Sequence, residues 1–368
     1  MDADTTVTAP EVTASGVTAS GVTAPAVTAS GRSGRPTMRD VAARVGVSQA
    51  LVSLVFRNAP GASTETRERV FRAAAELGYH PDAAAQVLRR NRSRHIGVLF
   101  TMRQPFDVDL VEAIYRAAER RGYQVVLGAL GVGRTDRQAV EELLAYRSEA
   151  MILSGTTTKA AQLARVADQM PVVDIGRRFT GDDVDVVRVA DERGARLVVD
   201  HLVSLGHRRI VHIGGGDLPA AARRRRGYRQ AMRRHGLGHE IRILPGDYTE
   251  ESGATAGRSL LDDAQLPTAV FAANDRCAHG VLDTLTRARV DVPGDVSVAG
   301  YDDSEIARLS FIDLTTVRQD ATQMAEHAVQ AIIERLDHGR TEAREIILDP
   351  TLVVRGTTGP PRPDNAIK

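Results

Sequence analysis

Hydrophobic and polar residues follow a regular alternation along most of the chain. From residue 95 onward, short apolar runs alternate with longer stretches in which apolar residues recur at helical spacing. The predicted buried strands are Ile96–Phe100, Val125–Leu130, Ala150–Leu153, Val172–Ile175, Ile210–Ile213, Ala269–Ala272 and Val296–Ala299. The predicted helices are Asp109–Arg121, Arg137–Arg147, Gly194–Leu205, Arg223–His235, Glu251–Asp262, Ala278–Arg287 and Ala321–Asp337. Such alternation predicts an α/β fold with parallel sheets covered on both faces.

The length of this alternating region predicts two lobes. About 270 residues are too many for one sheet of ordinary size, so we expect two doubly wound lobes. A ligand cleft is then expected where the carboxyl ends of the strands meet. The predicted boundaries are 95–356 for the body, 95–189 with 318–345 for lobe one, 190–317 with 346–356 for lobe two, and 357–368 for a C-terminal tail.

The region before the body has a purely helical pattern. Thr37, Ser48 and Ser63 are N-cap candidates, and each precedes a stretch with apolar residues on one helical face. Gly46 interrupts the first stretch, and Gly78 ends the third as a C-terminal cap. The pattern predicts three short helices, the first two joined by a tight turn, which is helix-turn-helix spacing.

Two segments flank this predicted helical module at 36–80. Residues 7–31 repeat a Val-Thr-Ala unit without any aromatic side chain, so we expect 1–35 to be a disordered tail. Residues 81–94 open with a proline at the start of a short possible helix and end in a basic run, which predicts a hinge and linker.

Positive charge is concentrated around the helical module. The chain has a net charge of +1, yet residues 32–94 hold twelve Arg against five acidic residues. Lysine occurs only at Lys159 and Lys368, so a general preference for arginine explains the choice of residue. It does not explain why the excess lies in one segment. A basic module ahead of a nearly neutral body is typical of a protein that binds a polyanion.

Several classes of protein are excluded by simple absences in the sequence. Cys277 is the single cysteine, so no internal disulfide is expected. No run of about 20 strongly apolar residues predicts a membrane span, and residues 1–31 lack the basic start of a secretory signal. The glycines at 214–216 lack a nucleotide-loop pattern, and no catalytic or zinc-ligand spacing is present. We therefore expect a cytoplasmic protein that is not an enzyme and needs no metal or cofactor.

Ordered motifs run through both parts of the chain. The helical module contains DVA at 40–42, GVS at 46–48 and LGY at 77–79, and the body contains LGHRRI at 205–210, AND at 273–275, SVAGYDD at 297–303 and LTTVRQD at 314–320. Over roughly residues 36–356 the sequence resembles the LacI/GalR (lactose-repressor) family of transcriptional regulators. Because these motifs occur in series, the resemblance is far more specific than one short pattern.

The resemblance implies a homodimer that binds a double-stranded, pseudo-palindromic DNA operator. Gln49 and Ala50 would read bases in the major groove, since Gln can pair with adenine and Ala can meet a thymine methyl group. Phosphate contacts are implied for Thr37, Ser48, Ser53, Asn58, Ser63 and Thr66. The hinge would place Ala85 and Leu88 in the minor groove, with the leucine as a wedge between base steps. Leu51 and Leu54 stand where the family commonly has Thr and Arg, which puts the outer half-site bases in doubt.

For the body, the resemblance implies a small, sugar-like effector between the lobes. Arg224 and Asp302 would clamp it, since a guanidinium can hold vicinal hydroxyls or a carboxylate. The other implied effector-binding residues are Phe106, Val189, Tyr248, Asn274 and Gln319. Alternatively, most of the arginines at 223–226 form a solvated helix face, and Asn274 forms part of a turn. Gly176 stands where many family members carry Asp, which removes one acceptor for a sugar hydroxyl and favours an effector other than a common hexose.

The sequence therefore predicts a cytoplasmic, nucleoid-associated transcriptional repressor whose operator affinity is set by a small ligand. The alternative is a periplasmic-type sugar-binding protein of a transporter, which would share the two lobes. Such a protein should carry a signal peptide and lack the basic helical module, and this chain shows the reverse. A sugar-modifying enzyme is a third reading, but the chain lacks a catalytic set.

Overall fold

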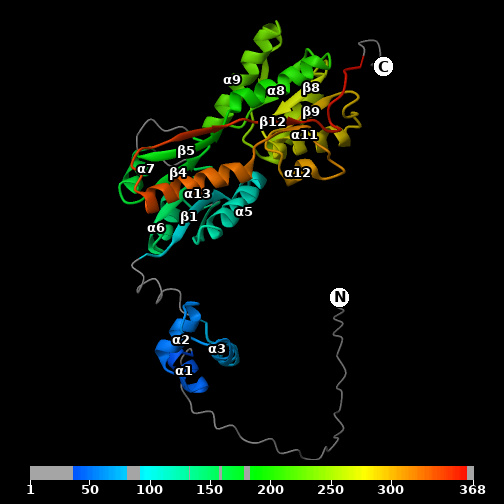
Figure 1. Cartoon of the computed structure of the whole chain (residues 1–368). Coiled ribbons are helices and arrows are strands. Elements are labelled where there is room, and N and C mark those ends of the chain that lie inside the picture. Colours follow the sequence, from blue (N-terminus) through cyan, green and yellow to red (C-terminus); the bar gives the residue numbers. More distant parts are fainter. Residues whose placement is uncertain (1–35, 81–91, 132, 157–159, 178–182, 363–368) are drawn as a thin grey trace, which may run out of the picture. The chain divides into compact units, whose positions relative to one another are not determined.

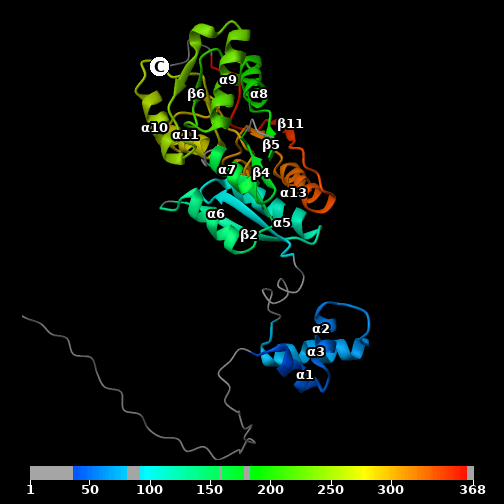
Figure 2. The same ribbon diagram turned by 90° about the vertical axis from the view of Figure 1, so that its left-hand side faces the viewer.

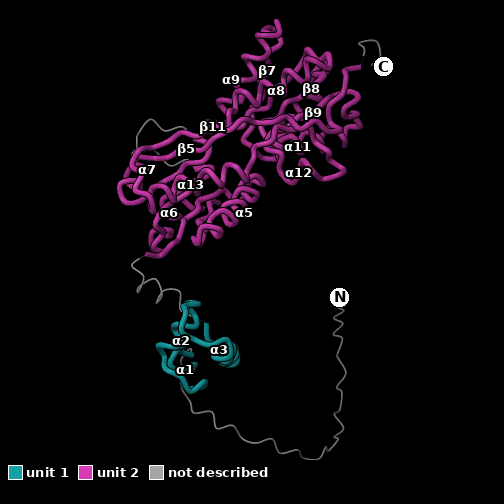
Figure 3. Tube along the Cα trace, in the orientation of Figure 1, with its two compact units in different colours: residues 1–86 teal, residues 87–368 magenta. Residues whose placement is uncertain are grey.

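The computed structural model describes residues 36–80, 92–131, 133–156, 160–177 and 183–362. The predicted N-terminal tail and most of the predicted hinge, including Ala85 and Leu88, lie outside the described residues. Contacts within the chain divide it into two compact units, residues 1–86 and 87–368, which are coloured separately in Figure 3. Each unit is described by itself.

The described part of the first unit is helical, as the sequence predicts. Its helices are α1 (Met38–Val45), α2 (Gln49–Phe56) and α3 (Thr64–Leu77). The side chains of Ser48 and Ser63 each accept a hydrogen bond from the backbone nitrogen three residues later, at 3.1 and 3.2 Å. Gly46 and Gly78 end α1 and α3 with φ values of 76° and 64°, a conformation that favours glycine. These caps fix where each helix begins and ends.

A small apolar core holds the three helices together. Its buried members include Val41, Val52, Val55, Val70 and Tyr79. The Phe56 ring lies 5.6 Å from Phe71 and 5.5 Å from Tyr79, centroid to centroid, which are favourable aromatic spacings. Because α2 buries its valines in this core, the residues at its first turn stay exposed.

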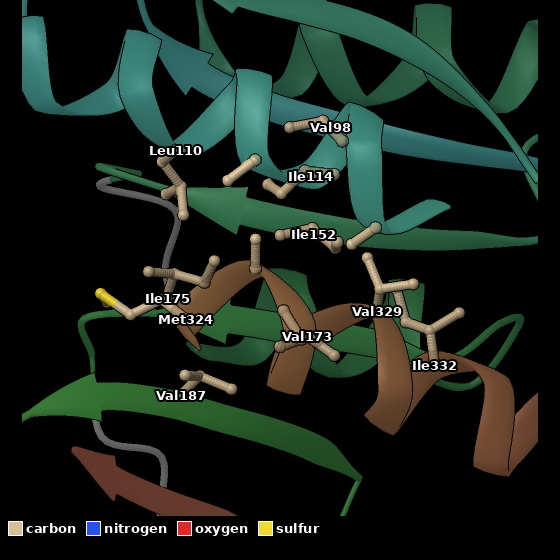
Figure 4. Close-up of a cluster of buried hydrophobic side chains, with 14 of the residues drawn as sticks. Val98, Leu110, Ile114, Ile152, Val173, Ile175, Val187, Met324, Val329 and Ile332 are labelled. Carbon is tan, nitrogen blue, oxygen red and sulfur yellow. The ribbon is translucent and has the colours of Figure 1, made fainter. Parts of the chain in front are cut away.

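The first lobe of the second unit is built on a parallel sheet. Within the described residues its six strands run in the order β11 (Glu345–Leu348), β5 (Val184–Val189), β4 (Val172–Ile175), β3 (Ala150–Ser154), β1 (His95–Thr101) and β2 (Gln124–Leu130). Helices α5 (Pro105–Glu119) and α13 (Ala321–His338) pack on one face, and α6 (Asp136–Ala145) and α7 (Ala160–Ala167) on the other. Figure 4 shows Val98, Ile152 and Val173 of the strands facing Ile114 of α5 and Val329 of α13.

The second lobe repeats this arrangement on a smaller scale. Its four described strands run in the order β7 (Arg242–Leu244), β6 (Ile210–Ile213), β8 (Ala269–Ala272) and β9 (Ser297–Ala299), all parallel. Helices α8 (Asp191–Ser204) and α9 (Pro219–Arg234) cover one face, and α10 (Glu250–Leu261) and α11 (Asp275–Arg287) the other (Figures 1 and 2). The short helices are η1 (Gly238–Glu240) and α12 (Glu305–Arg308). The prediction of two doubly wound lobes is confirmed.

The chain passes between the lobes more than once. It crosses after β5, again between β10 (Thr316–Arg318) and α13, and again between β11 and β12 (Thr351–Val353). Strands β10 and β12 pair antiparallel at this crossover. The first sheet extends to Leu348, three residues beyond the expected limit of lobe one at 345, because β11 adds an edge strand to β5.

Strand β5 was not predicted, because charged residues interrupt its apolar run. Asp185 is 1% exposed, and its carboxylate accepts hydrogen bonds from Arg335 at 2.7 Å and from Arg340 at 2.9 Å. Burial alone would raise the pKa of Asp185, but these arginines lower it. A buried and paired carboxylate therefore occupies a position that sequence periodicity assigns to the surface. In the described part of the chain, no helix combines the length and the apolar character needed to span a membrane.

Candidate functional site

A cleft of about 390 Å³ lies between the two lobes of the second unit. The residues that line it lie at the ends of β1, β3 and β4 in the first lobe, or in the loops after β6, β8 and β9 in the second. The cleft therefore lies at the carboxyl ends of the strands. This is the place and the size of a small-molecule site. Six predicted effector-binding residues line it: Phe106, Arg224, Tyr248, Asn274, Asp302 and Gln319.

The guanidinium of Arg224 lies at the centre of the second-lobe wall and is only 4% exposed. Its Nε donates to Asp191 Oδ1 at 3.0 Å, and its Nη1 donates to the Ala273 carbonyl at 2.6 Å. Nη1 also lies 3.5 Å from Asp302 Oδ1. The Tyr301 ring stacks below, with its centroid 3.6 Å from Cζ. The side chain is therefore held rigidly by a carboxylate, a carbonyl and an aromatic face.

Both the backbone and the side chain of Asp302 are held by residues at the crossover between the lobes. Its backbone adopts a φ of 119°, a strained value for a residue other than glycine. Its nitrogen donates to the Val317 carbonyl at 2.8 Å, and its Oδ1 accepts from Gln319 Nε2 at 2.6 Å. Burial raises the pKa of Asp302, and the charge of Arg224 opposes that rise. Strain of this kind recurs at binding sites, where surrounding contacts impose it.

Asn274 has a structural role as well as a place in the cleft. Its Oδ1 caps α11 by accepting from the backbone nitrogen of Cys277 at 2.9 Å. Its Nδ2 donates to Gln104 Oε1 at 3.2 Å and to the Tyr248 carbonyl at 3.3 Å. Because Gln104 belongs to the first lobe, this bond joins the two walls. The turn interpretation of Asn274 and its position in the cleft are therefore compatible.

Tyr248 brings a buried hydroxyl to the cleft. The residue is 7% exposed, and its hydroxyl has no hydrogen-bond partner among the described residues. Burial raises the pKa of Tyr248 to about 12, so the hydroxyl stays protonated. A Cβ atom on Gly215 would lie 2.4 Å from this ring, so the glycine is required for the ring to fit. A buried hydroxyl without a partner is costly unless a ligand supplies one.

Val189 is not brought to the cleft with the other six residues. It lies at the end of β5, is 2% exposed and belongs to the apolar core between the sheet, α5 and α13. Its neighbours there include Val187 and Met324, and Met324 itself lines the cleft. Val189 therefore lies in the core beneath the site rather than in its wall.

Two buried carboxyl groups of the first-lobe wall were missed by sequence reasoning. Asp107 accepts from Ser154 Oγ at 2.7 Å and from the Thr101 nitrogen at 3.1 Å, and burial raises its pKa to about 6. Asp174 accepts from the Arg177 nitrogen at 3.0 Å. Burial raises the pKa of Asp174 to about 7, against the opposing charge of Arg177. The sequence offered one sign of a buried carboxyl group, because Asp174 lies within the otherwise apolar run 172–175.

At Gly176 a second bond joins the two walls. The glycine has a φ of 99°, and its carbonyl accepts from Arg223 of α9. Arg223 also pairs with Asp191 at 2.9 Å. A third contact between the lobes runs from Arg276 to the Arg103 carbonyl at 2.7 Å. The backbone of Gly176 therefore binds the opposite lobe directly.

The candidate nucleic-acid interface lies on the first unit. Gln49 and Ala50 are exposed in the first turn of α2, and Ser53, one turn later, is half-buried. The Thr37 hydroxyl donates to Asp40 Oδ2 at 2.6 Å, beside the start of α1. Within the part of the chain that the structure describes, the side chain of Gln49, the candidate base reader, is exposed and makes no hydrogen bond to protein.

The remaining phosphate-contact candidates surround the start of α3. Asn58 has a φ of 49°, and its Oδ1 accepts from Arg67 at 3.1 Å. The hydroxyls of Ser63 and Thr66 lie 2.9 Å apart. Several hydroxyls implied as phosphate contacts thus also serve as helix caps. Ala85 and Leu88 lie outside the described residues.

The described residues contain no group of three or more His, Cys, Asp or Glu side chains placed to hold a metal ion. Several polar and charged groups of the cleft instead bind one another, among them Asp302 with Gln319 and Asp107 with Ser154. The arrangement can bind a ligand rich in hydroxyl groups through Arg224, Asp302 and the Tyr248 hydroxyl.

Two protein-family models match the chain. The model of bacterial regulatory proteins of the lacI family matches residues 37–82. A periplasmic binding protein-like domain matches residues 199–358. The first match covers the helix-turn-helix unit, and the second covers most of the second lobe and the crossover.

Curated relatives match almost the whole described chain. The ribose operon repressor of Escherichia coli (strain K12) is 33% identical over 330 residues, which cover 87% of this chain and 99% of the relative. The HTH-type transcriptional regulator GalR of the same organism is 32% identical, with coverage of 88% and 96%.

Solved structures of similar proteins share the fold. A LacI transcriptional regulator from a Rhodococcus species is 47% identical, with a TM-score of 0.70 and coverage of 72% of this chain and 98% of that one. The lac repressor dimer bound to operator and the anti-inducer ONPF is 29% identical, with a TM-score of 0.73 and coverage of 89% and 100%. The complex of the regulator CelR with cellobiose is 30% identical, with a TM-score of 0.63 and coverage of 88% and 100%.

The raised pKa of Asp174 predicts a pH dependence of stability. Between its ordinary pKa of 3.8 and about 7, the folded protein binds a proton that the unfolded chain releases. The stabilisation from this group is therefore lost as the pH rises through that window. We expect the thermal midpoint of wild type to fall more steeply between pH 5 and pH 8 than that of Asp174→Asn. The exposed Asp168→Asn serves as control, and parallel curves for wild type and Asp174→Asn would contradict the prediction.

Proposed function

This chain belongs to the LacI family of bacterial regulatory proteins, and we propose that it represses transcription from an operator under the control of a small, sugar-like ligand. The combination that carries the proposal is an exposed recognition turn at Gln49 in one unit and the Arg224–Asp302 cleft in the other. A periplasmic-type transport protein is not favoured, because the regulatory-family match covers the helix-turn-helix unit. Regulation rather than catalysis is the role that the relatives support.

For the DNA interface we propose major-groove recognition by the first turn of α2. A Gln side chain can pair with adenine N6 and N7, and the small Ala50 leaves room for a thymine methyl group. Thr37, Ser48, Ser53, Asn58, Ser63 and Thr66 are the proposed phosphate contacts. Phosphate contacts position the module, while the two exposed residues of α2 specify the sequence. Leu88 is proposed as the minor-groove wedge of the hinge.

Gln49→Ala tests the base-reading role. We expect specific operator affinity to fall by about tenfold, because one bidentate base contact contributes ~1–3 kcal/mol of discrimination. Affinity for random DNA should stay within twofold, since the phosphate contacts remain. Both affinities are measured by fluorescence anisotropy with a fragment of the protein's own promoter region and with a scrambled duplex, over a range of salt concentrations.

The control for this experiment is Arg39→Gln, which removes an exposed charge near the start of α1. It should weaken binding to both duplexes equally and lower the salt dependence. Equal loss of specific and random binding in Gln49→Ala would show that the side chain does not read bases.

For the effector we propose a ligand whose hydroxyl groups meet Arg224, Asp302 and Tyr248. The Tyr248 hydroxyl and the Arg224 fork offer directed donors, and Asp302 offers an acceptor. The similar structures include the complex of the regulator CelR with cellobiose, which supports a sugar-like molecule. Ligand binding changes operator affinity only if the two lobes bind it unequally in their alternative arrangements.

Asp302→Asn and Arg224→Ala test this clamp. Each charge-assisted hydrogen bond lost in a closed cleft is expected to weaken effector affinity about ten- to a hundredfold. Operator binding should persist, because the DNA interface is built in a separate unit. Isothermal titration uses whichever of ribose, cellobiose or galactose stabilises wild type in a thermal-shift screen. Because Arg224→Ala removes one of the two arginine partners of the buried Asp191, the isosteric Asp302→Asn keeps the test valid if the first variant unfolds.

We propose that the active form is a homodimer joined through α5 and the segment after α12. Val108 and Tyr115 lie on one face of α5 and are 48% and 44% exposed. Leu309 and Phe311, 36% and 80% exposed, follow α12, which packs against α5. Clustered exposed apolar side chains mark interaction surfaces, and a lac repressor dimer is among the similar structures.

Phe311→Ser should shift the protein toward monomer in sedimentation-velocity runs at micromolar concentration, because truncation of a central apolar anchor weakens an interface by about 2 kcal/mol or more. Val354→Ser is the control, since Val354 is 56% exposed but lies after β12. A dimer that survives Phe311→Ser unchanged would place the interface elsewhere.

A further inference from the structure

The outer face of α9 is a surface of arginine side chains. The helix contains seven arginines and no acidic residue. Its inner face, with Arg224, Gly227 and Tyr228, is buried against the lobe. Its outer face carries Arg225, Arg226, Arg229 and Arg233, here called the arginine face. With Ala222 and Gln230 these side chains line a surface hollow of about 460 Å³.

The arginines of α9 differ in the partners that they have among the described residues. The arginines that flank it are neutralised, since Arg223 and Arg224 pair with Asp191, and Arg234 pairs with Asp200. Within the face, Arg226 pairs with Glu192.

Arg229 and Arg233, by contrast, make no hydrogen bond or ion pair with any residue that the structure describes. Among the described residues, the one hydrogen-bond acceptor of Arg225 is the Gly216 carbonyl, at 2.6 Å. The acidic residues of α8 thus compensate one side of α9 and leave this side uncompensated.

The geometry concentrates this charge along a line. Arg225, Arg229 and Arg233 follow one another at intervals of four residues, which places successive Cα atoms about 6 Å apart along the helix. Like charges at this spacing repel each other and destabilise the helix. Burial together with nearby arginines, including Arg225 and Arg229, lowers the pKa of the buried His212 to about 3. An anion with several charges would relieve the repulsion.

The chemistry of the hollow selects the class of anion. Guanidinium groups match phosphate oxygens with paired hydrogen bonds. Ala222 is the one apolar side chain in the lining, so a ring or an acyl chain has no wall to pack on. The lining comes from a single helix, which offers little to a duplex or a folded protein. We propose that the arginine face binds a linear chain of phosphate groups, supplied as inorganic polyphosphate or as the phosphate tail of a nucleotide.

The arginine face is connected to the effector cleft through α9 and the loop before it. Arg224, on the inner face, lines the cleft, and Leu218 just before the helix lines it too. Arg225 holds the carbonyl of Gly216, next to the glycine that contacts the Tyr248 ring. A phosphate that takes Arg225 releases this carbonyl and changes the support of Tyr248. Binding of phosphate at the arginine face would therefore change the affinity of the cleft for its ligand, whichever ligand the cleft binds.

The test is isothermal titration of the full-length protein with inorganic triphosphate, without magnesium, at 150 mM salt. The double variant Arg229→Gln/Arg233→Gln should bind at least tenfold more weakly than wild type. The matched control is Arg208→Gln/Arg289→Gln, which removes two exposed arginines of the same lobe with the same change in charge. It should bind within twofold of wild type. The first unit is also basic, so the variant Arg39→Gln/Arg72→Gln measures how much that unit contributes to triphosphate binding. Its affinity for triphosphate should also stay within twofold of wild type.

The other outcomes decide the proposal. Titration with ATP distinguishes the two sources: equal affinity for ATP and triphosphate indicates the phosphate chain alone, and tighter ATP binding indicates a nucleotide. Absence of triphosphate binding by wild type overturns the proposal. So does an equal loss in all three double variants, which would show general electrostatic attraction. Binding of duplex DNA or polyglutamate that depends on Arg229 and Arg233, without triphosphate binding, overturns it in favour of a macromolecular partner.

Discussion

The second lobe is organised around one buried charge, the guanidinium of Arg224. A buried charge must be paired and hydrogen-bonded, and removing its partners costs about 3–5 kcal/mol. Asp191 at the start of α8, the Ala273 carbonyl after β8 and Asp302 after β9 meet this requirement together. The Tyr301 ring closes the remaining side. One side chain thereby fixes the relative positions of several loops at the carboxyl ends of the strands, and the cleft exists because those loops converge on it.

The residues next to the cleft explain why the motifs at 273–275 and 297–303 predict a site. Asp275 accepts hydrogen bonds from Ser304 at 2.8 and 3.0 Å and from Thr316 at 2.5 Å. Asp303 accepts from Arg318 at 2.7 Å and from Arg355 at 2.6 Å. These contacts hold the residues around Asp302, whose backbone has a positive φ of 119°. One residue of each motif lines the cleft, Asn274 or Asp302, and the acidic residue that follows it, Asp275 or Asp303, holds the loop in shape.

Sequence patterns predicted what local physics determines and missed what depends on distant partners. The apolar strands β1, β3, β4, β6 and β8 and the caps at Ser48 and Ser63 follow from short-range rules, and the structure confirms them. Strand β5 was missed because Asp185 finds its arginine partners about 150 residues away. Asp107 and Asp174 were missed for a related reason: a carboxyl group is assigned to the surface unless its three-dimensional partners are known. Val189 was expected in the cleft wall from the family resemblance, but it belongs to the apolar core of the first lobe, a placement that its position in the sequence does not reveal.

The bonds across the cleft decide how much a ligand can change. Asn274 with Gln104, Arg223 with the Gly176 carbonyl and Arg276 with the Arg103 carbonyl all join one lobe to the other. These hydrogen bonds within the chain favour the closed arrangement of the lobes without a ligand. A ligand therefore contributes only the difference between its affinities for the closed and the open arrangement. The contact at Gly176 is one part of this balance. The backbone carbonyl of Gly176 accepts a hydrogen bond from Arg223 of α9, so part of the free energy of closure comes from the protein itself. The proposed ligand therefore acts on an equilibrium that the contacts across the cleft already favour.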